Sequence, residues 1–231
     1  MAKEKKRNVK LSDQLVLRNF MLHLLEVDSF EELAKDMRDN SLEELDTDNV
    51  SLFYKHLSSR LKDREELDND VLRQYDENIV SHTLRINEKR DKDIKWKYFQ
   101  YLSLLFAEIY LDRYFNHREK LLSDLNAFID KFNESKTKAE VLSYYDEDSL
   151  KKLAFWNATG SGKTLLMHVN ILQYLHYFYQ NNRREELEQV ILLTPNENLS
   201  KQHLREFEAS GLQAALFDKN MQGLFRGNEI S

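Results

Sequence analysis

The stretch NATGSGKTLL (residues 157–166) decides how the fold of this sequence is interpreted. Two glycines flank a serine, and a lysine and a threonine follow directly before an apolar run. Glycine tolerates the backbone conformations that let several N–H groups point into one small volume, and phosphate groups need such donors. The N-terminus of a following helix adds further N–H groups and a partial positive charge. The stretch therefore predicts a phosphate-binding loop between a strand and a helix.

The side chains of this loop suit a nucleotide bound together with Mg²⁺. Lys163 is the residue expected to act in catalysis, because its ammonium group would reach the β- and γ-phosphates, and the Thr164 hydroxyl would be a Mg²⁺ ligand. The usual pattern G-x-x-x-x-G-K-[ST] begins with glycine, where this chain has Asn157. The alternative is a glycine turn with a surface lysine, which this spacing disfavours. The residues expected to bind ATP and Mg²⁺ are Thr159, Gly160, Ser161, Gly162, Lys163 and Thr164.

The segments around the loop predict alternating strands and helices. The run at 189–195 is continuously apolar and ends at Pro195, which is typical of a strand buried on both faces of a parallel sheet. A strand, loop, helix, strand order indicates a parallel α/β sheet. The expected strands are 153–156, 189–195 and 212–217, and the expected helices are 164–180 and 196–211.

The first part of the chain has a different pattern. No glycine or proline precedes Gly160, which favours helices over strands and tight turns. The aromatic segment 94–115 is expected to be the central core helix, with base stacking as the alternative use of its rings. Ser29 and Glu32 form a capping-box pattern, and Ser12 or Asp13 is a plausible cap of the first helix. The expected helices are 11–27, 29–37, 50–61, 69–90, 94–115 and 117–133.

Composition excludes several classes of protein. The 231 residues carry a net charge of −6, so no global basic field draws the chain to nucleic acid. The absence of cysteine excludes disulfides and thiolate metal sites and fits a reducing compartment, so we expect a cytoplasmic protein. No apolar run is long enough for a membrane span. Residues 1–10 are basic and are expected to be a disordered tail, with a nucleic-acid-touching arm as the alternative.

Two motifs resemble those of superfamily 2 helicases and translocases. ATGSGKT (158–164) looks like motif I, and LLTPNENLSKQ (192–202) resembles motif Ia, whose pattern is P-T-x-x-L-A-x-Q. Asn196 stands where the pattern has threonine, and Ser200 stands where it has alanine. A capped helix start after a buried strand is the simpler interpretation of the second motif taken alone. The resemblance implies contacts with a nucleic-acid backbone through Thr194, Pro195, Asn196 and Gln202.

Within this superfamily the motifs are most similar to DEAD/DEAH-type helicase-like proteins of the type III restriction (Res) subunit group and to bacterial defence helicases. The resemblance implies a mixed fold, in which an all-α domain (11–148) precedes a partial α/β RecA-like lobe with parallel strands (149–231). It also implies an ATP-dependent DNA helicase or translocase, with other subunits of a restriction or phage-defence complex as partners.

One part of a hydrolysing motor is missing from the sequence. No D-E-x-H or D-E-x-D box, whose carboxylates hold Mg²⁺ and position the attacking water, lies between Lys163 and Ser231. We therefore expect the N-terminal part of a motor, as a fragment, truncated product or split subunit that is inactive alone. A non-hydrolysing nucleotide-binding or partner-docking module is the alternative. Another kind of phosphate-loop ATPase, such as a kinase or transporter subunit, is disfavoured by the second motif.

Overall fold

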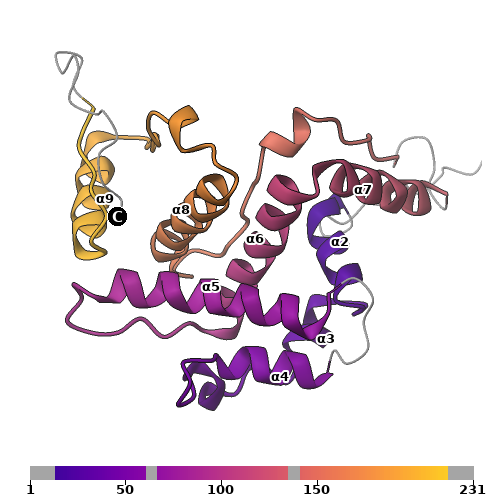
Figure 1. The fold of residues 1–231 in the computed structure, drawn as a ribbon, viewed down its shortest axis with the longest axis horizontal. Coiled ribbons are helices and arrows are strands. Elements are labelled where there is room, and N and C mark those ends of the chain that lie inside the picture. Colours follow the sequence, from indigo (N-terminus) through magenta and orange to yellow (C-terminus); the bar gives the residue numbers. More distant parts are fainter. Residues whose placement is uncertain (1–13, 61–66, 135–140, 218–231) are drawn as a thin grey trace, which may run out of the picture.

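The computed structural model describes residues 14–60, 67–134 and 141–217, and this part of the chain is built from helices (Figure 1). The expected tail at 1–10 and the expected cap at Ser12 or Asp13 lie outside the described residues. Short 3-10 turns occur at Asn40–Glu43, Ser149–Lys151 and Arg184–Glu186. The α-helices are α2 (Val16–Leu24), α3 (Phe30–Ala34), α4 (Leu52–Arg60), α5 (Asn69–Asn87), α6 (Tyr98–Asn116), α7 (Arg118–Asn133), α8 (Lys163–Gln180) and α9 (Glu197–Ala209).

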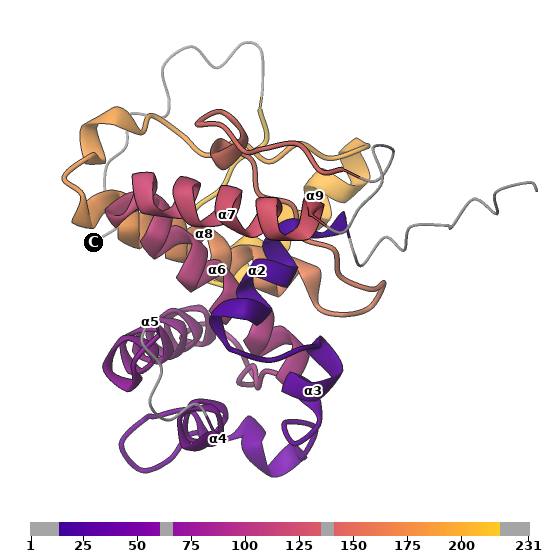
Figure 2. The same ribbon diagram turned by 90° about the vertical axis from the view of Figure 1, so that its right-hand side faces the viewer.

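Helix α6 lies at the centre of the molecule. It packs against α5, α7 and α8, and its contact with α8 is the most extensive between any two helices described (Figure 2). Leu102, Ile109 and Tyr110 of the predicted stripe are buried, and Phe99 and Phe106 are half-buried. The prediction of a central core helix is therefore confirmed.

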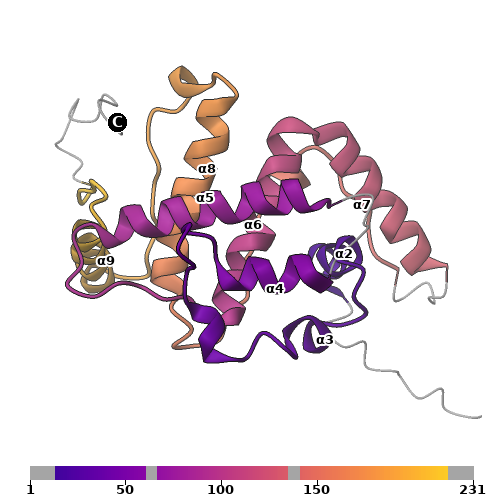
Figure 3. The same ribbon diagram turned by 60° about the horizontal axis from the view of Figure 1, so that its bottom comes forward.

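Helix α8, which begins at the predicted phosphate-binding loop, belongs to the same core. It crosses α5 (Figure 3), and its Val169 and Leu172 are buried in the cluster that also contains Leu102. The division into domains at 11–148 and 149–231 stays a prediction. The packing nonetheless ties the helix after the loop directly to helices from the first half of the chain.

A buried polar cluster joins three of these helices. The Tyr177 hydroxyl of α8 donates to Glu108 Oε2 of α6 at 2.7 Å, and Asn78 Nδ2 of α5 donates to the same oxygen at 3.3 Å. Burial raises the pKa of Glu108 to about 7. Its Oε1 and the nearby buried Oε1 of Gln173 each lack a hydrogen-bond partner among the described residues. A protonated Glu108 would supply the hydrogen that these two oxygens lack.

The predicted α/β fold is wrong for the part of the chain that the structure describes. Residues 153–156, 189–193 and 212–217 contain no strand, and the one β-bridge in the described ranges joins Leu45 and Ser51 far from them. Their apolar side chains are not buried either, since Trp156, Leu193 and Phe217 are 80%, 88% and 85% exposed. In place of a parallel sheet, these segments run irregularly beside α8 and α9 (Figure 1).

The physical reason lies in backbone hydrogen bonding. A helix satisfies its N–H and C=O groups internally, whereas a strand needs a neighbouring strand for each row of donors and acceptors. No segment within 14–60, 67–134 or 141–217 pairs with the three apolar runs. The continuous apolar pattern correctly identified segments that are not helical. It does not contain the pairing that would turn them into a sheet.

Candidate phosphate-binding site

Both glycines of the loop have left-handed backbones. Gly160 has a φ of +78° and Gly162 has a φ of +80° at the N-cap of α8. Residues with a Cβ pay a steric cost in this region, so the chain needs glycine at both positions. The Ser161 N–H donates to the Ala158 carbonyl at 3.2 Å, which closes a turn between them. The local sequence thus folds as expected into a tight loop that leads into a helix N-terminus.

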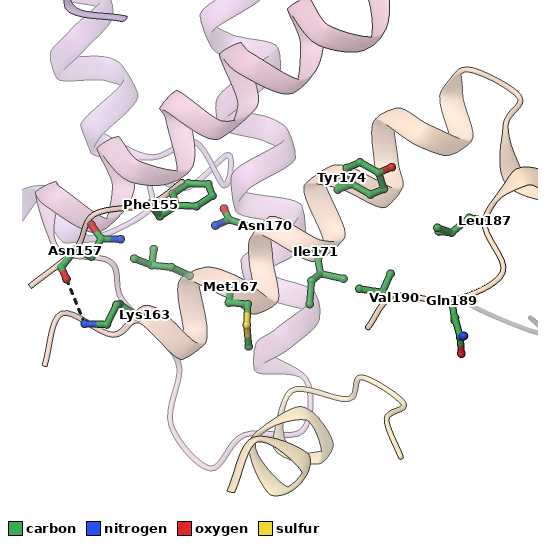
Figure 4. A pocket seen from close by; sticks show the side chains of 11 residues that line it. Phe155, Asn157, Lys163, Met167, Asn170, Ile171, Tyr174, Leu187, Gln189 and Val190 are labelled. Atoms are coloured by element: carbon green, nitrogen blue, oxygen red, sulfur yellow. Dashed lines mark hydrogen bonds between the residues drawn. The ribbon is translucent and has the colours of Figure 1, made fainter. Parts of the chain in front are cut away.

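The Lys163 side chain folds back over the loop. Its ammonium group donates to the Ala158 carbonyl at 2.8 Å. It also donates to the Asn157 carbonyl at 3.2 Å, the bond drawn in Figure 4. Lys163 is exposed, so these bonds compete with water and are readily exchanged. The positive charge is therefore held at the mouth of the loop, where an incoming phosphate would replace the two carbonyls as its partner.

Gln100 of α6 fixes the loop from the other side. Its Oε1 accepts from the Lys97 N–H at 2.8 Å, and its Nε2 donates to the Ser161 carbonyl at 2.9 Å. These two bonds set the orientation of the amide. A Cβ added at Gly162 would lie 2.5 Å from this Nε2, so the Gln100 amide would have to shift from its position. Sequence reasoning did not find Gln100, because no local pattern links positions 61 residues apart.

Ser161 supplies an observation that favours an anion at this site. The residue is buried, and its hydroxyl oxygen has no hydrogen-bond partner among the described residues. A buried hydroxyl without a partner costs free energy, and a phosphate oxygen is a partner of the right kind. With the helix N-terminus and Lys163, the donor set is suited to phosphate.

A cavity of about 440 Å³ lies beside the loop, between α8 and the irregular segments. Ile171 on α8 faces Val190, and Phe155 and Met167 line the same space (Figure 4). Lys163 borders one end of it. Because most of the wall is apolar, this cavity is not itself the phosphate site. It marks the place where the apolar segments fail to close over α8.

The residues of the second motif gather at the start of α9. The Asn196 side chain accepts from the Leu199 N–H at 3.0 Å and caps the helix, and the Thr194 hydroxyl contacts the Ser200 hydroxyl at 2.5 Å. Pro195 and Gln202 are exposed. The four predicted nucleic-acid contacts thus lie at one helix N-terminus, but Asn196 and Thr194 already have partners within the protein.

A buried polar link attaches α9 to the helical core. Arg90, just beyond α5, donates to the Ser210 hydroxyl at 2.6 Å, and that hydroxyl contacts His168 Nδ1 of α8 at 2.8 Å. His168 also stacks on Phe207 of α9 with ring centroids 4.4 Å apart. Burial lowers the pKa of His168 to about 4, so its imidazole is neutral. These contacts, which sequence reasoning did not find, set the position of α9 relative to the phosphate-binding loop.

Two further properties concern the described ranges only. They contain no group of three or more His, Cys, Asp or Glu side chains suited to a metal ion. Nor is any helix within them long and apolar enough to cross a membrane.

Comparison with known protein families gives a match. The family model described as "Type III restriction enzyme, res subunit" matches residues 111–229, which is just over half of the chain and includes both motifs. No curated protein and no solved structure matches the sequence.

Proposed function

Because the chain belongs to the family of type III restriction enzyme res subunits, we propose that it supplies the ATP-binding loop of an ATP-dependent DNA helicase or translocase. The observation that carries the proposal is the loop itself. Two left-handed glycines, an unpartnered Ser161 hydroxyl and the Lys163 ammonium converge at the N-terminus of α8. Bound ATP·Mg²⁺ would supply the energy of phosphoanhydride hydrolysis.

Each loop residue has a role in this proposal. The N–H groups from Gly160 to Thr164, except that of Ser161, donate to phosphate oxygens, and Lys163 exchanges its two carbonyl partners for the β- and γ-phosphates. The Thr164 hydroxyl ligates Mg²⁺. Thr159 borders the loop and contributes to its turn. Gln100 keeps the Ser161 carbonyl turned away from the phosphates, so that the donors face them.

The start of α9 is the proposed contact with the DNA backbone. Pro195 and Gln202 are exposed there, and the helix N-terminus favours a phosphate. Thr194 and Asn196 hold this turn in shape through their internal hydrogen bonds. The protein would work in the cytoplasm, together with other subunits of a restriction or phage-defence complex.

Calorimetry with ATP·Mg²⁺ tests the nucleotide part of the proposal. We expect the wild-type chain to bind and Lys163→Ala to lose binding, because the variant removes the one cation of the loop. Lys152→Ala is the matched control, since it removes an exposed lysine outside the loop and should bind like the wild type. Thr164→Ala should weaken the dependence of binding on Mg²⁺. A folded wild-type chain that binds no ATP would refute the proposal.

The second candidate is a non-hydrolysing module that docks a partner protein. It is favoured by the exposed apolar side chains of 189–193. Large exposed apolar patches mark interaction sites. The two candidates differ in the calorimetry above, because the docking module predicts that Lys163→Ala leaves every measurable interaction unchanged.

A further inference from the structure

A second cavity, of about 250 Å³, opens between α5 and α8 and away from the phosphate-binding loop. Its polar lining consists of five side chains, and Leu172 and Leu175 form its apolar wall. Lys163 begins α8 and His176 lies 13 residues further on, so the cavity is about 20 Å from the loop along the helix axis. The polar residues are His82 and Arg85 of α5 and His176, Tyr179 and Gln180 of α8.

These five polar side chains share an unusual property. None of them forms a hydrogen bond or an ion pair with another residue of the described ranges. The Nε2 atoms of His82 and His176 are buried and have no hydrogen-bond partner in the described ranges, while the two rings meet edge to face with centroids 5.7 Å apart. Buried polar atoms are almost always paired in folded proteins. A ligand with hydrogen-bond acceptors would provide partners for these two buried atoms.

The charge around the cavity indicates which kind of ligand this is. No acidic side chain of the described ranges lines it, and the Arg85 guanidinium has no ion-pair partner among them. Arg184 lies over the Tyr179 ring at 5.3 Å and adds positive charge at the edge. Burial, with smaller contributions from His176 and Arg85, lowers the pKa of His82 to about 4. The carbonyl end of α8 opposes an anion weakly, and Arg85 outweighs it with a full charge.

We propose that the cavity between α5 and α8 binds the terminal phosphate of a small ligand, held by Arg85, His82 and His176. Arg85 provides a planar fork of N–H donors that suits phosphate oxygens, and each imidazole provides a further ring N–H. The group must have a free end, because the buried Nε2 atoms lie between the two helices. A phosphodiester inside a nucleic-acid strand carries a sugar on each side and does not reach them. Binding would tie α5 to α8.

Inorganic phosphate is the probe for the test, with the full chain in the Lys163→Ala background so that the loop does not contribute. Calorimetry should detect binding, and Arg85→Gln in that background should weaken it about tenfold or more, because it removes a charged hydrogen-bond donor. Arg73→Gln is the matched control, since Arg73 lies on the same helix and pairs with Glu77 outside the cavity. It should leave the affinity unchanged.

Two further measurements locate the ligand and its source. On addition of phosphate, the imidazole ¹⁵N resonances of His82 and His176 should shift, whereas those of the distant His23 should not. A short single-stranded oligonucleotide with a 5′-phosphate should compete with phosphate, and the same oligonucleotide without it should not. The proposal is overturned if phosphate does not bind, if Arg85→Gln binds like its parent, if the two histidines do not respond, or if the unphosphorylated oligonucleotide competes equally.

Discussion

Helix α8 and the segment 189–193 are both rich in apolar residues, but the apolar side chains of α8 are largely buried and those of the segment are exposed. Val169 and Leu172 of α8 are buried against α5 and α6, whereas Ile191 and Leu193 point into solvent. The helix satisfies its own backbone hydrogen bonds, so only its apolar face needs a partner, and two helices provide one. The irregular segment needs a neighbouring strand as well, and none is present among the described residues. An apolar run therefore indicates burial only where its backbone can also be satisfied.

The sharpest test of this contrast compares leucines in the two regions. Leu102→Ala in α6 should lower the free energy of unfolding by about 2–5 kcal/mol, because Leu102 is completely buried and its loss leaves a cavity. Leu193→Ala should change it by less than about 0.5 kcal/mol, since the side chain is already in water. Urea denaturation of both variants measures the difference. Equal losses would show that 189–193 is packed in solution.

A second prediction concerns the buried carboxyl between α6 and α8. The pKa of Glu108 is raised from 4.5 to about 7, so the folded state binds a proton that the unfolded state releases in this window. The stability that Glu108 contributes through this proton is fully present below pH 4.5 and is lost as the pH rises through 7. The loss should be on the order of 3 kcal/mol.

Glu108→Gln is the variant that isolates this effect. Its amide still accepts from Tyr177 and offers N–H groups to the unpaired oxygen of Gln173, but it does not titrate. Relative to the wild type, the variant should gain stability as the pH rises through this window, because its side chain no longer loses a proton there. Both proteins keep the decline from Asp76, whose pKa burial raises to about 6, and the opposing rise from His82 and His168, whose pKa burial lowers to about 4. An unchanged profile in Glu108→Gln would assign the pH dependence to other groups.

The third prediction tests the junction between the helical core and the loop. Gly162→Ala places a Cβ 2.5 Å from Gln100 Nε2 and also forces alanine into a left-handed backbone, which alone costs about 1–2 kcal/mol. Gly160→Ala pays the backbone cost only, because open space surrounds its Cβ position. Gly162→Ala should therefore destabilise the protein more than Gly160→Ala does.

The contribution of Gln100 follows from a double-mutant cycle. Adding Gln100→Ala to Gly162→Ala removes the clash, so the two changes together should cost less than the sum of their separate effects. Additive effects, measured as free energies of unfolding in urea, would mean that the amide moves aside freely and does not hold the loop.

The smallest effect is expected at the N-terminus of α9. Asn196→Ala removes the side-chain acceptor of the Leu199 N–H and should cost about 1 kcal/mol. Because α9 is attached mainly through His168, Phe207 and Ser210, the loss should appear as faster amide hydrogen exchange within α9 and not in α6. Asn196→Asp, which keeps an acceptor, is the control. Faster exchange throughout the molecule would indicate that α9 unfolds together with the core.

Much of the helical architecture could be predicted, because helices depend on local patterns. The periodic apolar positions of 94–115 and the cap at Ser29 correspond to α6 and α3, and the Ser29 hydroxyl accepts from the Glu32 N–H at 3.1 Å. The parallel sheet was predicted wrongly from apolar runs alone. Gln100, Arg90 and Ser210 were missed, because each acts through a contact with a residue far away in the sequence.

By itself the sequence determined the helices, the two left-handed glycines and the lysine that follows them, since these depend on residue type within a few positions. It also indicated the family, through two short motifs that the family match over 111–229 includes. Only the tertiary structure decided that α8 joins the helical core, that Gln100 holds the loop, and that the apolar runs stay unpaired. Those outcomes depend on contacts between residues that are far apart in the sequence. The periodicity of apolar residues along the chain does not specify such contacts.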